Sequence, residues 1–171
     1  MSRNQTGRLL LHWQQQVKKS MPAIRVFLRR FAASLPSHRV LSDEHDKVFS
    51  SFDCLQCASC CKNSSPVFTR TDVTRIAGYL SLKPAEFELR YLRADDEGDF
   101  IPLHKPCPFL LADNHCSVYD VRPKSCRGFP HTDNPDAWLR HGLMAGNAAA
   151  CPAAFAIVEK FRNSGQSPKP A

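Results

Sequence analysis

Four of the eight cysteines in this sequence fall within eight consecutive residues, 54–61, in the pattern C-x-x-C-x-x-C-C. The C-x-x-C spacing lets two sulfurs fold onto one ion in a tight turn, as in metal and redox sites. The other four cysteines are spread over the following ninety residues. We predict that all eight are metal ligands, namely Cys54, Cys57, Cys60, Cys61, Cys107, Cys116, Cys126 and Cys151.

The number of cysteines fits metal binding, because a buried thiolate is costly unless a cation stabilises it. Zinc sites and cubane iron–sulfur clusters each take four thiolates, so eight cysteines match two sites, or one site plus spare thiols. Adjacent residues point their side chains apart, so Cys60 and Cys61 are predicted to serve different sites, or one site and a structural contact. The pairing of the remaining cysteines into sites stays open.

Cysteine usage also bears on the compartment. No secretory signal and no stretch long enough to span a membrane is visible, and the cysteine density is below that of small disulfide scaffolds. We therefore expect a reducing cytoplasm, where clustered cysteines hold metal or do redox chemistry. A disulfide framework is the second alternative.

The net charge of +7 is unevenly distributed. Residues 1–42 hold eight basic side chains and no acidic one, whereas the rest of the chain holds 15 basic and 16 acidic side chains. The high isoelectric point therefore belongs to the N-terminal segment, and the pattern does not favour a nucleic-acid partner.

From Pro22, apolar residues recur at helical spacing, which predicts a basic amphipathic helix ended by Pro36. Such a helix can dock on the rest of the chain, make weak contact with an anionic membrane surface, or contact an acidic protein partner. A partly ordered helix with a solvated basic face is the favoured alternative, and an organellar transit peptide is a minor one.

Downstream of the segment 1–45, short elements and turns alternate. A polar connection is predicted from Asp43 to Asp53 and a β-hairpin over residues 109–119. Helices are predicted from Thr71-Asp72, from Pro84 and over residues 152–161, and an edge strand over residues 100–103.

These elements predict a small α+β fold, a helix- and loop-rich single domain with a short β-hairpin, cross-linked by metal. The predicted organisation is a basic N-terminal arm at residues 1–45, a metal-binding domain at residues 46–162 and a flexible tail at residues 163–171.

Polar residues beside the cysteines have alternative roles. His104 and His115 can replace a cysteine at a site, although a surface role is favoured for each. Arg122 and Arg127 can offset thiolate charge or form ordinary salt bridges. Asp53 can accept a hydrogen bond near the metal, although a turn role is simpler.

The box at Cys54 to Cys61 is followed in order by Cys107-Pro108-Phe109-Leu110, Cys116-Ser117-Val118-Tyr119, Arg122-Pro123 and Cys126-Arg127-Gly128-Phe129-Pro130. The order of these motifs resembles a bacterial cysteine-cluster family of zinc- or iron-chelating domains, over roughly residues 50–155.

The resemblance implies a cytoplasmic bacterial protein that binds zinc or iron, or an iron–sulfur cluster. The cysteine pattern is also similar to that of flagellin lysine methylases, which makes an iron–sulfur redox or methyl-transfer enzyme the alternative function. A metal carrier is a further alternative. No nucleophile elbow, phosphate loop or paired-carboxylate motif is present to identify a catalytic residue.

Overall fold

The computed structural model describes residues 4–164, and their contacts divide into two compact units. The helical unit comprises the described residues up to Cys57 and those from Pro130 onward. The cysteine-rich unit comprises Ala58–Phe129. The boundary between Cys57 and Ala58 lies inside the C-x-x-C-x-x-C-C segment, so this segment supplies cysteines to both units.

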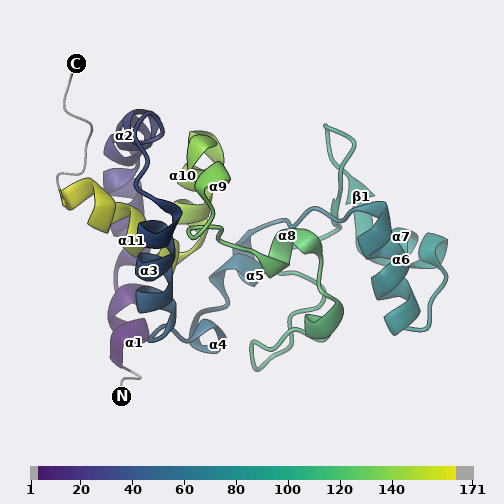
Figure 1. Cartoon of the computed structure of the whole chain (residues 1–171). Coiled ribbons are helices and arrows are strands. Elements are labelled where there is room, and N and C mark those ends of the chain that lie inside the picture. The colour runs from purple at the N-terminus through teal and green to yellow at the C-terminus, as the bar shows by residue number, and fades with distance from the viewer. Residues whose placement is uncertain (1–3, 165–171) are drawn as a thin grey trace. The chain divides into compact units, whose positions relative to one another are not determined.

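The helical unit is built around α2 (Trp13–Phe31), which packs against α10 (His141–Ala150) and α11 (Pro152–Asn163) (Figure 1). Helix α11 also contacts α1 and α3. The remaining helices of this unit are α1 (Asn4–Leu10), α3 (His38–Phe49), α4 (Cys54–Cys57) and α9 (Pro135–Leu139).

Helix α2 is longer than predicted and starts nine residues before Pro22. Proline costs about 3 kcal/mol inside a helix, but burial of one whole face outweighs that cost here. The buried face consists of Trp13, Val17, Ile24, Phe27, Leu28 and Phe31. The apolar face is therefore docked within the helical unit, and the basic side chains of α2 are exposed. This grouping divides the chain differently from the predicted arm and body.

The core of the helical unit centres on Trp138, which is fully buried. Its ring lies 5.1 Å from the ring of Phe31 and 5.4 Å from that of Phe161, measured between centroids. Helix α3 occupies most of the predicted polar connection, so that prediction was wrong. Its Leu41 is fully buried in this core, which gives the segment an apolar anchor despite its charge.

The cysteine-rich unit is made of short elements. Helices α6 (Arg70–Tyr79) and α7 (Pro84–Tyr91) pack side by side (Figure 1). Thr69 and Asp72 form a capping box that starts α6, and Pro84 occupies the first turn of α7. The other elements are α5 (Ser59–Asn63), β1 (Leu92–Ala94), β2 (Phe100–Pro102), the short 3-10 helix η1 (Tyr119–Val121) and α8 (Lys124–Arg127).

The sheet of this unit has two antiparallel strands, β1 and β2, in which Leu92 pairs with Pro102. The predicted edge strand is thus confirmed, whereas β1 was not predicted. The predicted hairpin over residues 109–119 is reduced to one bridge, between Leu110 and Cys116. A small helix-rich fold with a short antiparallel sheet is confirmed at this coarser level.

The predicted tail lies mostly outside the described residues. Of the predicted tail at residues 163–171, only residues 163 and 164 belong to the described part. Within residues 4–164, no helix combines the length and the apolar character that crossing a membrane requires.

Candidate metal centre

Helix α5 carries Cys60 and Cys61 into the cysteine-rich unit. Ala58 stands at its N-cap in the left-handed conformation, with φ of 49°. A non-glycine residue in this region is costly, by roughly 1–2 kcal/mol, so tertiary contacts must hold the turn. The two Sγ atoms lie 3.9 Å apart. The prediction that these adjacent cysteines serve different roles is not tested by this spacing.

Backbone pairing brings three distant cysteines of this unit together. The amide of Cys107 donates to the carbonyl oxygen of Cys61 at 2.8 Å. The amide of Leu110 donates to the Cys107 carbonyl oxygen at 3.0 Å, and Leu110 forms the bridge with Cys116. These contacts place Cys107 and Cys116 beside the segment of Cys61, although they follow it by 46 and 55 positions in the chain. Local sequence patterns alone do not determine such a placement.

Cys126 completes this group from the four-residue helix α8, where its amide donates to the Pro123 carbonyl oxygen at 2.9 Å. Burial raises the pKa of Cys126, and the negative charges of Cys107, Cys61 and Cys116 raise it further. These four cysteines of one unit form a candidate ligand group. We call them the four-cysteine group: Cys61, Cys107, Cys116 and Cys126.

Burial dominates the electrostatics of this group. It raises the pKa of the Cys107 thiol to about 11 and that of the Cys126 thiol to about 12, and the neighbouring thiolates add to both shifts. The pKa of Cys116 is raised by burial and by Cys61, against the opposing charge of Arg122. These thiols therefore stay protonated at neutral pH unless a cation stabilises their ionised form.

Cys61 differs from the other three members. Its pKa falls to about 7, mainly because of the hydrogen bond with the Cys60 thiol, with a further contribution from the charge of Lys62. Burial opposes this shift. Cys61 is consequently the member of the group that most readily supplies a thiolate, the form that binds metal.

A second group of thiols lies in the helical unit, at Cys54, Cys57 and Cys151. Cys151 is buried between α10 and α11, and burial raises its pKa to about 11, with a further increase from the charges of Cys57 and Cys54. Cys54 and Cys57 are the two ends of α4.

Asp53 fixes the start of α4. Its carboxylate accepts hydrogen bonds from the amide of Leu55 and the side chain of Gln56, both at 2.9 Å. The amide of Asp53 in turn donates to the hydroxyl of Thr6 at 2.8 Å, which links α4 to α1. The simpler turn role predicted for Asp53 is the one found.

The donor chemistry of both groups fits a metal ion, since thiolates are ligands that zinc and iron readily accept. Within residues 4–164, however, no three His, Cys, Asp or Glu side chains converge closely enough to hold an ion. The structure therefore groups the thiols without showing a metal cross-link. The assignment of all eight as ligands stays a prediction.

The other predicted side chains occupy the surface near the group. His104 is exposed, and His115 is paired with Asp113 at 3.2 Å. The guanidinium of Arg122 lies 3.9 Å from the ring centre of Tyr119, and its charge lowers the pKa of Cys116. The contacts of Arg122 are with the ring and the carbonyl oxygen of Tyr119, so neither of the two roles weighed for Arg122 is tested by them.

Two residues that hold the segment before Cys126, Asp72 and Arg75, were not predicted to contact it. Asp72 is almost fully buried, and Arg75 donates to carbonyl oxygens at residues 121 and 122. The pattern Thr69-x-x-Asp72 is a capping signature that was visible in the sequence. The contacts of Arg75, 46 residues away along the chain, had no such signal.

Comparison with known proteins covers the cysteine-bearing part of the chain. Residues 53–152 match the CxxCxxCC family, described as "Putative zinc- or iron-chelating domain". An uncharacterized protein of Methanocaldococcus jannaschii is 33% identical over 84 residues, which is 47% of this chain and 45% of that protein. The chain thus spans about half the length of this curated relative. No solved structure matches the chain.

The family match covers more than half of the chain and includes every predicted ligand from Cys54 to Cys151. The motifs quoted from the sequence and the matched residues agree in extent. This chain therefore belongs to the CxxCxxCC family of zinc- or iron-chelating domains.

Proposed function

We propose that this protein binds a zinc or iron ion through the thiolates of the four-cysteine group. The proposal is supported by the backbone contacts that bring Cys107 beside Cys61 and link it through Leu110 to Cys116, and by the family match over residues 53–152. Buried thiolates repel one another, so the cluster is unfavourable in its ionised form by itself. A divalent cation reverses each of those interactions, and four thiolates match its usual coordination.

The metal would also supply stability where the fold has little of its own. Among the described residues, the core of the cysteine-rich unit contains eight buried apolar side chains, against sixteen in the helical unit. Small units with limited cores commonly depend on a metal for folding. A structural role for the ion therefore agrees with where the four-cysteine group lies.

Cys54, Cys57 and Cys151 form a second candidate set in the helical unit. We infer that it takes an ion less tightly than the four-cysteine group, because three thiolates compensate less of the cationic charge than four. We also infer a reducing compartment such as the cytoplasm, because clustered cysteines there hold metal more often than they form disulfides.

Metal analysis of the full-length protein, purified without oxygen, tests the proposal. We expect about one or more equivalents of zinc plus iron per chain, and less than about half an equivalent would refute it. Cys126→Ser should remove about one equivalent. Cys151→Ser, the matched control from the helical unit, should leave the ion of the four-cysteine group in place.

A visible spectrum of the same samples identifies the metal. Iron–sulfur clusters give a brown protein through thiolate-to-iron charge transfer, whereas a zinc protein is colourless. A brown, redox-active sample would favour the alternative of an iron–sulfur enzyme. Rapid loss of metal to a mild chelator would favour the carrier.

A further inference from the structure

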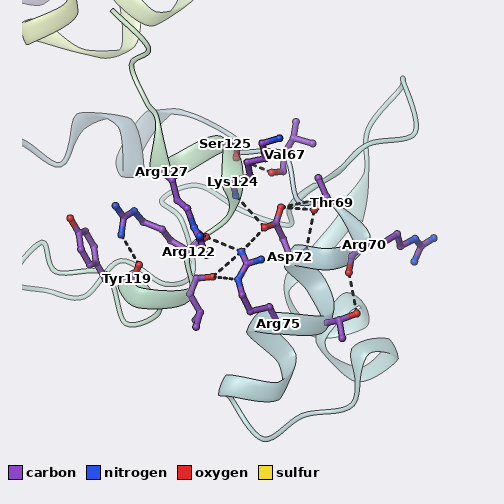
Figure 2. Close-up of polar contacts among 12 residues, drawn as sticks. Val67, Thr69, Arg70, Asp72, Arg75, Tyr119, Arg122, Lys124, Ser125 and Arg127 are labelled. Atoms are coloured by element: carbon purple, nitrogen blue, oxygen red, sulfur yellow. Dashed lines mark hydrogen bonds and ion pairs between the residues drawn. The ribbon is translucent and has the colours of Figure 1, made fainter. Parts of the chain in front are cut away.

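A polar network joins α6 to the segment that leads into Cys126 (Figure 2). Its centre is the carboxylate of Asp72, whose residue is only 1% exposed. The carboxylate accepts hydrogen bonds from the Thr69 hydroxyl at 2.7 Å and the Thr69 amide at 3.0 Å. It also accepts one from the amide of Lys124 at 3.2 Å, so it reaches α8 directly.

Arg75 donates hydrogen bonds to backbone carbonyl groups of the same segment. Its guanidinium donates to the carbonyl oxygen of Val121 at 3.3 Å and to that of Arg122 at 3.0 Å, and it forms an ion pair with Asp72. Residues 121 to 124 are therefore held at their carbonyl groups by Arg75 and at an amide by Asp72. Figure 2 shows both sets of contacts converging on the turn before α8.

The charged state of Asp72 fits this role. Burial alone raises the pKa of its carboxyl, but hydrogen bonds from Thr69, Arg75 and Lys124 more than offset burial and lower it. The carboxylate is thus ionised at neutral pH and acts as the acceptor for Thr69, Arg75 and Lys124. A buried ion pair contributes little net stability, so its main consequence here is the fixed geometry of the segment.

Helix α8 cannot fix its own position, because a helix of four residues has no intrinsic stability. Ser125 adds one contact, a hydrogen bond from its hydroxyl to the Val67 carbonyl oxygen at 2.8 Å. The placement of the Cys126 sulfur therefore depends on contacts made by residues just before it. The side chains of Asp72 and Arg75 tie this segment to α6, and Arg127 also donates to the Arg122 carbonyl oxygen, at 3.1 Å.

We propose that Asp72 and Arg75 are positioning residues that set Cys126 in place for metal binding. This inference rests on the proposed function, since it assigns Cys126 to the four-cysteine group. Residues that orient a metal ligand typically contribute 10–100-fold to metal affinity. The network is built from side chains that lie outside the cysteine motifs.

Zinc affinity, measured on the full chain by competition with a chelator, tests the positioning role. We expect Arg75→Gln to weaken zinc binding by about tenfold or more. Arg75→Lys keeps the charge but loses the planar fork that reaches two carbonyl groups, so it should weaken binding similarly. Arg70→Gln is the matched control, because Arg70 lies on the same helix and pairs with Glu88 instead. Wild-type affinity in Arg75→Lys would overturn the inference.

Alkylation of the metal-free chain separates positioning from general unfolding. In Arg75→Gln, we expect the rate at Cys126 to rise about tenfold relative to the rate at Cys107 of the same unit. An equal rise at both cysteines would mean a merely structural role and would overturn the inference. A wild-type chain that binds no zinc would refute the proposed function, while this ratio would still decide whether Arg75 positions Cys126.

Discussion

The two units of this protein achieve their folds by different means. The helical unit buries large aromatic side chains, with Trp138 in contact with Phe31 and Phe161. The cysteine-rich unit buries about half as many apolar side chains and consists of short elements connected by loops. The cysteines are divided unequally, since five of the eight lie in the unit with the smaller core. This contrast suggests that metal replaces hydrophobic burial in the cysteine-rich unit.

Metal removal should give the largest difference between the units. After chelation, we expect amides in α6 and α7 to exchange with solvent at least about 100-fold faster, because loss of a tightly bound ion removes several kcal/mol of stability. Amides in α2, α10 and α11 should change much less. Hydrogen exchange followed by mass spectrometry measures both sets in one sample. Equal loss of protection in both sets would remove the proposed contrast.

Truncation of a core side chain in the helical unit should lower stability without removing metal. Trp138→Ala should lower the free energy of unfolding by about 3–5 kcal/mol, because it removes a fully buried aromatic side chain. Metal content should stay near the wild-type value, since Trp138 belongs to the core of the helical unit, whereas the four-cysteine group belongs to the other unit. Denaturation monitored by circular dichroism, with metal analysis of the same sample, measures the two quantities.

The matched variant is Phe87→Ala in the cysteine-rich unit. Phe87 is fully buried and its ring stacks on that of Phe109, with centroids 5.9 Å apart. Because Phe109 lies two residues after Cys107, we expect this variant to lose metal as well as stability. Retention of metal in Phe87→Ala and its loss in Trp138→Ala would be the opposite of what the comparison predicts.

Alkaline pH should destabilise the metal-free protein. A thiol in the unfolded chain ionises near its ordinary pKa of 9.0, whereas the buried Cys151 thiol keeps its proton up to a pKa of about 11. The folded state therefore holds more protons than the unfolded state between these values. The stability that Cys151 contributes is fully present below pH 9, and this one thiol lowers it by about 1.4 kcal/mol per pH unit toward pH 11.

Denaturant titrations of the metal-free chain at pH 8, 9 and 10 measure this fall. Cys151→Ser removes one raised pKa from the helical unit and should flatten the slope. A slope that is unchanged in Cys151→Ser would show that this buried thiol does not contribute. Cys107, whose pKa is also raised to about 11, provides the corresponding variant in the cysteine-rich unit.

Substitution of a helix cap should give the smallest loss of stability, and each unit offers one cap for comparison. Thr69 caps α6 and Asn134 caps α9, and each side chain accepts the hydrogen bond of a backbone amide. Each Ala substitution should cost about 1 kcal/mol. Thr69→Ala should also weaken zinc binding, because Thr69 holds Asp72, whereas Asn134→Ala should not. Thermal unfolding and chelator competition distinguish the two variants.

Local sequence signals predicted the elements that local chemistry determines. The helix at residues 152–161 was predicted from Pro152 and the apolar spacing after it, and α11 begins at that proline. The helix from Pro84 was predicted in the same way, and α7 begins at that proline. In both cases the residues that form the structure are adjacent in the sequence.

Long-range contacts account for what was missed. The apolar face of α2 packs in the core of the helical unit. The sequence of α2 does not specify which other helices cover this face. The Cys107 amide donates a hydrogen bond to the Cys61 carbonyl oxygen, and Arg75 donates to the carbonyl oxygens of residues 121 and 122. Both contacts join segments about 46 residues apart. The sequence identified the eight cysteines as a set, but it left their division into groups open for this reason.

Cysteine alkylation during zinc titration tests the central claim most directly. The metal-free full-length chain is titrated with zinc, alkylated briefly, and each cysteine is quantified by mass spectrometry. We predict that Cys61, Cys107, Cys116 and Cys126 lose reactivity together at the first equivalent, because one ion takes all four thiolates. Protection of Cys54 and Cys57 at the first equivalent, with Cys107 and Cys126 still reactive, would contradict the proposed metal centre.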